Sequence, residues 1–97
     1  MYSKSVIVKN EVGLYGKAAT DLIQIANIYK CSIFIEHNDK KVNAKSLLGV
    51  LSLGLTKNTE IVLIGEGCDE KEAIERIADF LDSGKFDLND GYDDDDY

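Results

Sequence analysis

The chain contains no proline and no tryptophan, and among its 97 residues it has one histidine and two cysteines. Cys31 and Cys68 stand in unrelated contexts and match none of the spacings of metal or redox motifs. We therefore predict two ordinary buried thiols, with no disulfide framework and no metal site.

Long apolar runs are also missing. A run such as residues 61–64 (IVLI) is far shorter than the roughly 20 residues of a membrane-spanning helix, and the N-terminus has no hydrophobic signal region. We therefore expect a cytoplasmic protein without membrane contact. Basic residues are few: 11 Lys and Arg stand against 18 Asp and Glu, and no basic stripe is present to neutralise a run of phosphates. Direct nucleic-acid binding is not expected.

The remaining composition fits one small domain, because a 97-residue chain that is 44% hydrophobic can build a single modest core. The charge is unevenly distributed: residues 83–97 hold six aspartates and one lysine, a net −5, whereas residues 1–82 carry only −2. The last segment is rich in Gly and Asp and poor in apolar residues. We predict a domain over residues 1–82 and a flexible acidic tail over residues 83–97.

The tail resembles a calcium-binding loop only superficially. Counted from Asp87, the fifth position is Gly91, and no glutamate follows at the twelfth. A calcium loop needs an acidic or amide residue at its fifth position and a glutamate at its twelfth. We therefore predict neither a metal nor a cofactor.

Hydrophobic periodicity predicts the order β-α-β-β-α-β-α. The expected strands are residues 5–8, 31–36, 41–42 and 60–65; the expected helices run from Gly16 to near Tyr29, from Ser46 as N-cap to Gly54, and from Asp69 as N-cap through Leu81. The dipeptide Asn38-Asp39 tolerates positive φ and suits a two-residue hairpin turn. Two helices that bury their stripes on one face of a mainly antiparallel four-stranded sheet make an α+β fold.

Two segments resemble HPr, the small phosphocarrier family of the bacterial sugar phosphotransferase system. Residues 42–54 (VNAKSLLGVLSLG) resemble its regulatory-serine loop, and residues 13–19 (GLYGKAA) resemble the pattern Gly-(Ile/Leu)-His-Ala-Arg-Pro-Ala around its phosphoryl-accepting histidine. The resemblance covers roughly residues 1–82. It implies an HPr-like open-faced β-sandwich.

The resemblance places Tyr15 where the family has its histidine. An imidazole with a pKa near ~6.5 is a good neutral nucleophile, whereas a phenol with a pKa near ~10 is a poor one, and its phosphate ester is too stable to pass on. Lys17 and Ala18 replace the family arginine and proline, and Gly16 adds backbone freedom. Tyr15, Gly16 and Lys17 thus form a degenerate phosphocarrier site, and we expect His37, in the hairpin, to have no carrier role.

Ser46 matches the family serine that HPr kinase/phosphorylase phosphorylates with ATP, after which the phosphoprotein binds a LacI-type transcription regulator. At a helix N-cap, a phosphate adds roughly −2 charge beside unpaired amides, so little distortion is needed. The resemblance also implies a docking patch, flanked by lysines, that contacts kinase and regulator: Leu47, Leu48, Leu51, Lys45 and Lys17. The alternative readings are that Ser46 is a plain N-cap and that the leucines fill the core, as we expect for Val50 and Leu53.

The leading hypothesis is a non-catalytic regulatory protein of carbon catabolite control, phosphorylated on Ser46 and similar to the histidine-lacking, catabolite-repression type of HPr. The alternative is an interaction or dimerisation paralogue with both sites idle, either a monomer or a weak homodimer. An enzyme is not expected, because the sequence offers no base beside Cys31 or Cys68 and no acid-base pair near Lys17.

Overall fold

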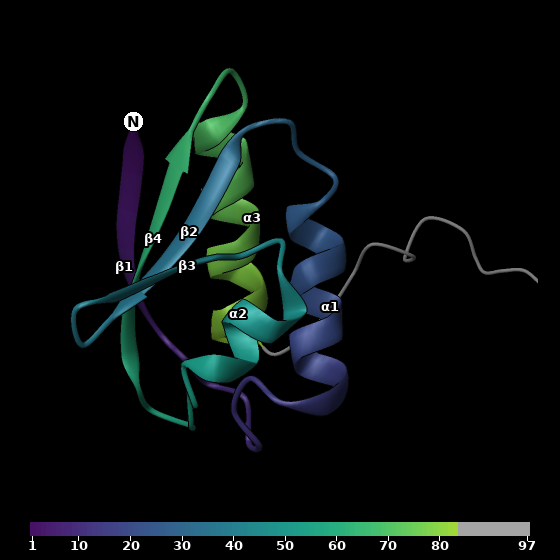
Figure 1. The fold of residues 1–97 in the computed structure, drawn as a ribbon, viewed down its shortest axis with the longest axis vertical. Helices are drawn as coiled ribbons and strands as arrows, with labels where there is room; N and C mark the ends of the chain where they lie inside the picture. Colours follow the sequence, from purple (N-terminus) through teal and green to yellow (C-terminus); the bar gives the residue numbers. More distant parts are fainter. Residues whose placement is uncertain (84–97) are drawn as a thin grey trace, which may run out of the picture.

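The computed structural model describes residues 1–83 and has the predicted order of elements (Figure 1). The elements are β1 (Tyr2–Ile7), α1 (Gly16–Ala26), β2 (Ser32–His37), β3 (Lys40–Asn43), α2 (Leu47–Ser52), β4 (Glu60–Glu66) and α3 (Glu70–Ser83). Ser83 is the last residue of α3, and the rest of the predicted tail, residues 84–97, lies outside the described residues.

The four strands form one antiparallel sheet in the order β1-β4-β2-β3, and the helices cover one face of it (Figure 1). His37 pairs with Lys40 across the β2–β3 hairpin, and Asn38 and Asp39 have φ values of 49° and 66°. The two-residue turn is therefore confirmed, because two successive positive φ values match the twist of the flanking strands. The α+β open-faced sandwich is confirmed with it.

The core lies between the sheet and the helices. Its largest fully buried side chains come from every layer: Val8, Leu14, Leu22, Ile25, Ile33, Ile35, Leu55, Ile61, Leu63, Ile74, Ile77 and Leu81. Each such side chain contributes roughly 1.5–3 kcal/mol through burial, so this cluster is what holds the loops at the ends of α1 and α2 in place. None of the helices within residues 1–83 is long and apolar enough to cross a membrane.

The first helix is shorter than its apolar stripe. It ends at Ala26, not near Tyr29, and a tighter turn follows. In this turn the amide of Ile28 donates to the carbonyl of Ile25 at 3.1 Å, and the amide of Tyr29 donates to the carbonyl of Ala26 at 3.3 Å. Such i to i−3 bonds keep the three-residue spacing, so Tyr29 is still buried although it is outside the α-helix.

One prediction about the turn before α3 is wrong and another is right in position only: Asp69 directly precedes α3, and its carbonyl accepts from the amide of Ala73 at 3.0 Å. Cys68 is exposed in this turn, whereas Cys31 is buried as expected. The Asp69 carboxylate does not cap its own helix; it accepts hydrogen bonds from the amides of Lys30 and Cys31, both at 2.9 Å. Asp69 therefore joins the start of α3 to the segment between α1 and β2.

Candidate docking and phosphorylation site

Ser46 lies in extended backbone, with φ −110° and ψ 117°, directly before α2. Its side-chain oxygen accepts a hydrogen bond from the amide of Gly49 at 3.2 Å, which confirms the predicted serine N-cap. Asn43 fixes the preceding turn from two atoms: its side-chain oxygen accepts from the Lys45 amide at 2.8 Å, and its carbonyl accepts from the Ser46 amide at 3.1 Å. The serine is thus held half-buried at the start of a short, well-anchored helix.

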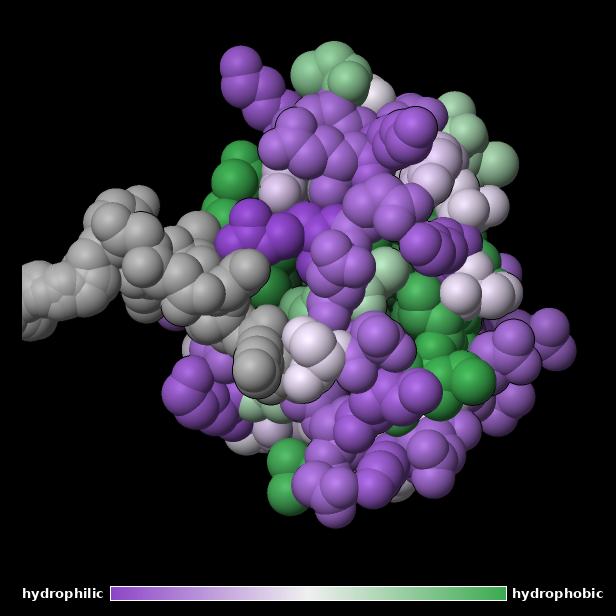
Figure 2. Space-filling view, turned by 180° about the vertical axis from the view of Figure 1, so that it is seen from behind, coloured by the Kyte–Doolittle hydropathy of each residue, from purple (hydrophilic) through white to green (hydrophobic). Residues whose placement is uncertain are grey.

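The leucines of α2 divide between the core and the surface. Leu48 is 81% exposed and Leu47 is 43% exposed, whereas Val50 is fully buried and Leu53 nearly so. Leu51 is half-buried and packs against the core. We call Leu47, Leu48 and Leu51 the leucine surface, whose exposed part comes from its first two residues. Seen from behind, the molecule is mainly hydrophilic, with hydrophobic residues in small separate patches (Figure 2).

Tyr15 lies at the N-cap position of α1 and is 40% exposed, but its side chain makes no capping hydrogen bond. Its hydroxyl oxygen lies 3.5 Å from the point where a Cβ on Gly54 would be, so the phenol reaches the end of α2. The preceding loop is tied to the same region, because the amide of Leu14 donates to the carbonyl of Leu55 at 3.0 Å. The fold thus brings the loop of Tyr15 and the serine-capped helix together.

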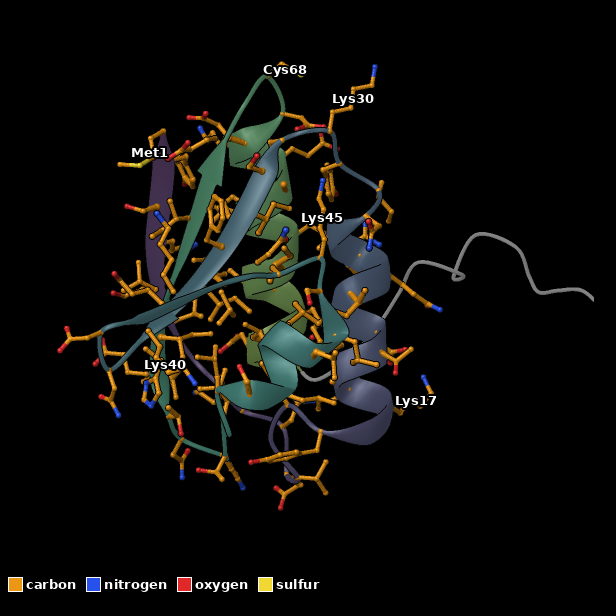
Figure 3. The ribbon with its side chains drawn as sticks, in the orientation of Figure 1. Met1, Lys17, Lys30, Lys40, Lys45 and Cys68 are labelled. Carbon is orange, nitrogen blue, oxygen red and sulfur yellow. The ribbon has the colours of Figure 1, made fainter. Side chains whose placement is uncertain are left out.

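Figure 3 labels three lysines in this region: Lys40 and Lys45 near α2, and Lys17 on the first turn of α1. Lys17 is largely exposed and forms an i,i+4 ion pair of 2.9 Å with Asp21, whose carboxylate is mostly buried. The ammonium of Lys45 donates to the carbonyl oxygen of Tyr29 at 2.7 Å, and that of Lys40 to the carbonyl of Ser52 at 3.3 Å. Lys40 was not among the flanking lysines predicted from the sequence. The signal that could have indicated it is that residues 40–59 contain four lysines and no carboxylate.

Other groups with possible chemistry are poorly placed for it. Burial, together with a hydrogen bond to Asp69, raises the pKa of the Cys31 thiol to about 11, so this buried sulfur stays protonated at neutral pH. His37 lies at the end of β2, with its Nδ1 atom 3.3 Å from the carbonyl oxygen of Glu60. The side chains that surround α2 are suited to binding, since an apolar centre within a charged rim is the usual anatomy of a protein-binding surface.

A four-stranded open sheet with helices on one face, a serine-capped second helix and an adjoining loop before the first helix define an HPr-type domain. The family model for the phosphorylation site of the HPr component of the phosphotransferase system matches residues 2–83. The chain belongs to the HPr family.

Relatives within this family agree with that assignment. The HPr-like protein Crh of Halalkalibacterium halodurans is 44% identical over 82 residues, which is 84% of this chain and 98% of the relative. The crystal structure of HPr-C-His from Thermoanaerobacter tengcongensis superposes with a TM-score of 0.85 at 37% identity, covering 88% of this chain and 98% of that one. A crystal structure of Crh from Bacillus subtilis, described there as a swapped dimer, gives a TM-score of 0.70 at 38% identity, covering 86% and 95%.

Proposed function

We propose that this protein is a regulatory member of the HPr family that receives phosphate on Ser46, transfers none through a histidine, and acts by docking on other proteins. One observation carries the proposal: Ser46 caps α2 beside the exposed Leu47 and Leu48, while the residue that the family resemblance aligns with the phosphoryl-accepting histidine is Tyr15. The similarity to Crh proteins supports a regulatory role over a carrier role.

The geometry at Ser46 is compatible with phosphorylation. The residue is partly exposed at a helix N-cap, and a phosphate on its oxygen would add roughly −2 charge beside the first amides of α2. The ammonium of the preceding residue, Lys45, donates to the carbonyl oxygen of Tyr29, which is an uncharged partner. The modification therefore changes the surface charge beside the leucines without requiring the helix to unfold.

The loop of Tyr15 does not support phosphoryl relay. A phenol is a weak nucleophile at neutral pH, and its phosphate ester is too stable for onward transfer. Lys17, which replaces the family arginine, forms a monodentate ion pair with Asp21 and lacks the planar fork that binds two phosphate oxygens at once. The side chain of Tyr15 instead adds to the surface beside α2, because its hydroxyl lies close to Gly54 at the end of that helix.

We propose that the partners are HPr kinase/phosphorylase and a LacI-type transcription regulator, as the family resemblance implies. Leu47 and Leu48 would supply the apolar centre of contact, and Lys45 and Lys17 the charged rim. Buried apolar anchors carry most of the binding energy at such interfaces, and rim charges act mainly on the association rate and its salt dependence.

The test of the phosphorylation site is intact mass after separate incubation with HPr kinase plus ATP and with enzyme I plus phosphoenolpyruvate. We expect one phosphate from the kinase alone, its loss in Ser46→Ala, and its retention in Ser52→Ala, because Ser52 is an exposed serine on the same helix. Phosphate from enzyme I would contradict the proposal, as would kinase labelling that survives Ser46→Ala.

The docking surface is tested by paired substitutions of exposed apolar residues. Leu48 is 81% exposed and Val12, in the turn between β1 and α1, is 69% exposed, so neither aspartate variant should unfold the domain. We expect Leu48→Asp to weaken binding to kinase or regulator at least about tenfold, and Val12→Asp to change it little. Equal effects of both variants would argue against the leucine surface.

The second candidate is a dimerisation paralogue, favoured by the swapped dimer described for the B. subtilis Crh crystal structure. In this case the leucine surface would contact a second copy of the chain. Light scattering over a range of concentrations would then show a dimer that Leu48→Asp dissociates and Val12→Asp does not. A dimer that survives Leu48→Asp would point to contacts elsewhere, including exchange of a strand.

A further inference from the structure

The charges of this protein are unevenly distributed among its elements. Residues 40–59, which form β3, α2 and the loop to β4, carry four lysines and no carboxylate. By contrast, α3 carries five carboxylates against the basic Lys71 and Arg76: Glu70, Glu72, Glu75, Asp79 and Asp82. Two lysines beside α2 are neutralised, Lys57 by Glu11 at 2.7 Å and Lys17 by Asp21.

Lys40 and Lys45 lack such neutralisation. Both ammonium groups donate to backbone carbonyl oxygens, and neither forms an ion pair with a carboxylate within residues 1–83. Figure 3 labels both lysines in the region of α2, the helix that carries the exposed Leu47 and Leu48. The surface therefore combines uncompensated positive charge with exposed apolar side chains, and an acidic segment with apolar residues would complement both.

We propose that this segment is the chain's own acidic tail, residues 84–97, which binds back onto the leucine surface and onto Lys40 and Lys45. The tail carries six aspartates against one lysine, four of the aspartates consecutive at 93–96. It also contains four large apolar or aromatic residues that match the leucines: Phe86, Leu88, Tyr92 and Tyr97. Its residues lie beyond the segment that the family model matches, which ends at residue 83.

The tail begins close enough to reach this surface. It follows Ser83 at the end of α3, where the carbonyl of Leu81 accepts from the amide of Lys9 at 3.1 Å. Lys9 starts the loop that leads to Tyr15 and so to the end of α2 at Gly54. Fourteen residues can reach at most about 50 Å, whereas the six residues of α2 rise only about 9 Å.

A tethered tail competes with partners even when the contact is weak, because a short flexible tether gives an effective concentration on the order of millimolar. A phosphate on Ser46 would add negative charge to the same surface and repel the aspartates, so phosphorylation would expose the leucines. This coupling rests on the proposed function, but the contact between tail and surface does not.

The test places a nitroxide spin label at the end of the full chain. In the variant Cys68→Ser with Tyr97→Cys, the label attaches at residue 97, since Cys31 is buried and its thiol stays protonated. The control carries the same label and asparagine at Asp93, Asp94, Asp95 and Asp96, which keeps the tether and removes four of its six negative charges. The difference between the two in the loss of amide NMR intensity isolates the charge-driven contact from simple proximity.

We expect the acidic tail to cause at least about a twofold greater intensity loss than the asparagine-substituted tail at the amides of Lys45, Leu47 and Leu48. Salt at about 1 M, where the Debye length is near 3 Å, should abolish most of this excess, and Ser46→Asp should reduce it. Equal losses for the two tails, or an excess centred on α3, would overturn the proposal. The spin-label experiment contains neither kinase nor regulator. Its result therefore does not depend on the outcome of the phosphorylation assay.

Discussion

The amide of Gly49 donates a hydrogen bond to the side-chain oxygen of Ser46 at 3.2 Å, so the proposed phosphate acceptor is also the N-cap of α2. The same oxygen therefore has a structural role that does not depend on the regulatory role proposed for it. Phosphorylation would replace a neutral acceptor with a doubly charged one at the same amide, which retains the cap while it changes the surface.

Replacing Ser46 with alanine should lower the free energy of unfolding by about 1 kcal/mol, because the amide of Gly49 loses its acceptor. Ser46→Asp should retain most of the stability, since a carboxylate also caps a helix. Urea unfolding monitored by circular dichroism measures both, with Ser3→Ala on the exposed side of β1 as control. A loss no larger than in the control would mean that the cap contributes little.

Gly13 and Gly16 allow backbone strain to be separated from collision. Both have positive φ, 75° and 55°, but a Cβ at Gly13 would lie 2.3 Å from the carbonyl oxygen of Leu55, whereas one at Gly16 would meet nothing within 4 Å. We expect Gly16→Ala to cost about 1 kcal/mol and Gly13→Ala roughly 3 kcal/mol or more in unfolding experiments. Similar costs for the two variants would mean that the loop shifts to admit the extra atom.

The Asp69 carboxylate should contribute to the acid dependence of stability. The amide of Lys30, followed by the thiol and amide of Cys31, lowers the pKa of this carboxyl below its ordinary value. A lowered folded-state pKa means that the contribution is fully present above the unfolded value near ~3.9 and is lost as pH falls through the folded value. Asp69→Asn should therefore be less stable than wild type at pH 7 and should lose less stability below pH ~4.

Asp39→Asn, in the exposed hairpin turn, removes the same charge without those hydrogen bonds and serves as control. Thermal unfolding from pH 2.5 to 7 gives the profiles of the three proteins. Parallel profiles for wild type and Asp69→Asn would show that the bonds to Lys30 and Cys31 do not govern acid unfolding.

The two cysteines should react differently. Cys68 is exposed, whereas Cys31 is buried and its thiol has a pKa raised to about 11. At pH 8, only roughly one part in a thousand of the Cys31 thiol is ionised, and the thiolate is the reactive form. Iodoacetamide should therefore add one adduct to the folded protein and two in denaturant, measured by intact mass. Two rapid adducts on the folded protein would indicate that the segment between α1 and β2 opens readily.

Local signals were enough to predict most of the elements. The turn at Asn38 and Asp39 was predictable because positive φ is a property of the two residues themselves, and the cap at Ser46 because its acceptor amide lies three residues away. The early end of α1 was not, because an apolar stripe at spacings of three fits both an α-helix and the tighter turn that holds Tyr29.

The errors at Asp69 and Cys68 have a different origin. An aspartate before a helix is usually a cap, but the two amides that Asp69 accepts from belong to residues 39 and 38 positions away. Whether a cysteine near a helix start is buried likewise depends on which elements cover the turn. Partners so distant along the chain leave no local signal.

The sequence by itself determined the order of elements, the hairpin, the serine cap and the family resemblance, because these depend on spacings and conformational preferences within a few residues. Only the tertiary structure decided that Tyr15 reaches the end of α2, that Lys45 bonds to the carbonyl of Tyr29, and that Leu48 is exposed while Leu51 packs against the core. Those relationships are set by how the helices pack on the sheet, and packing joins residues that are distant in the chain.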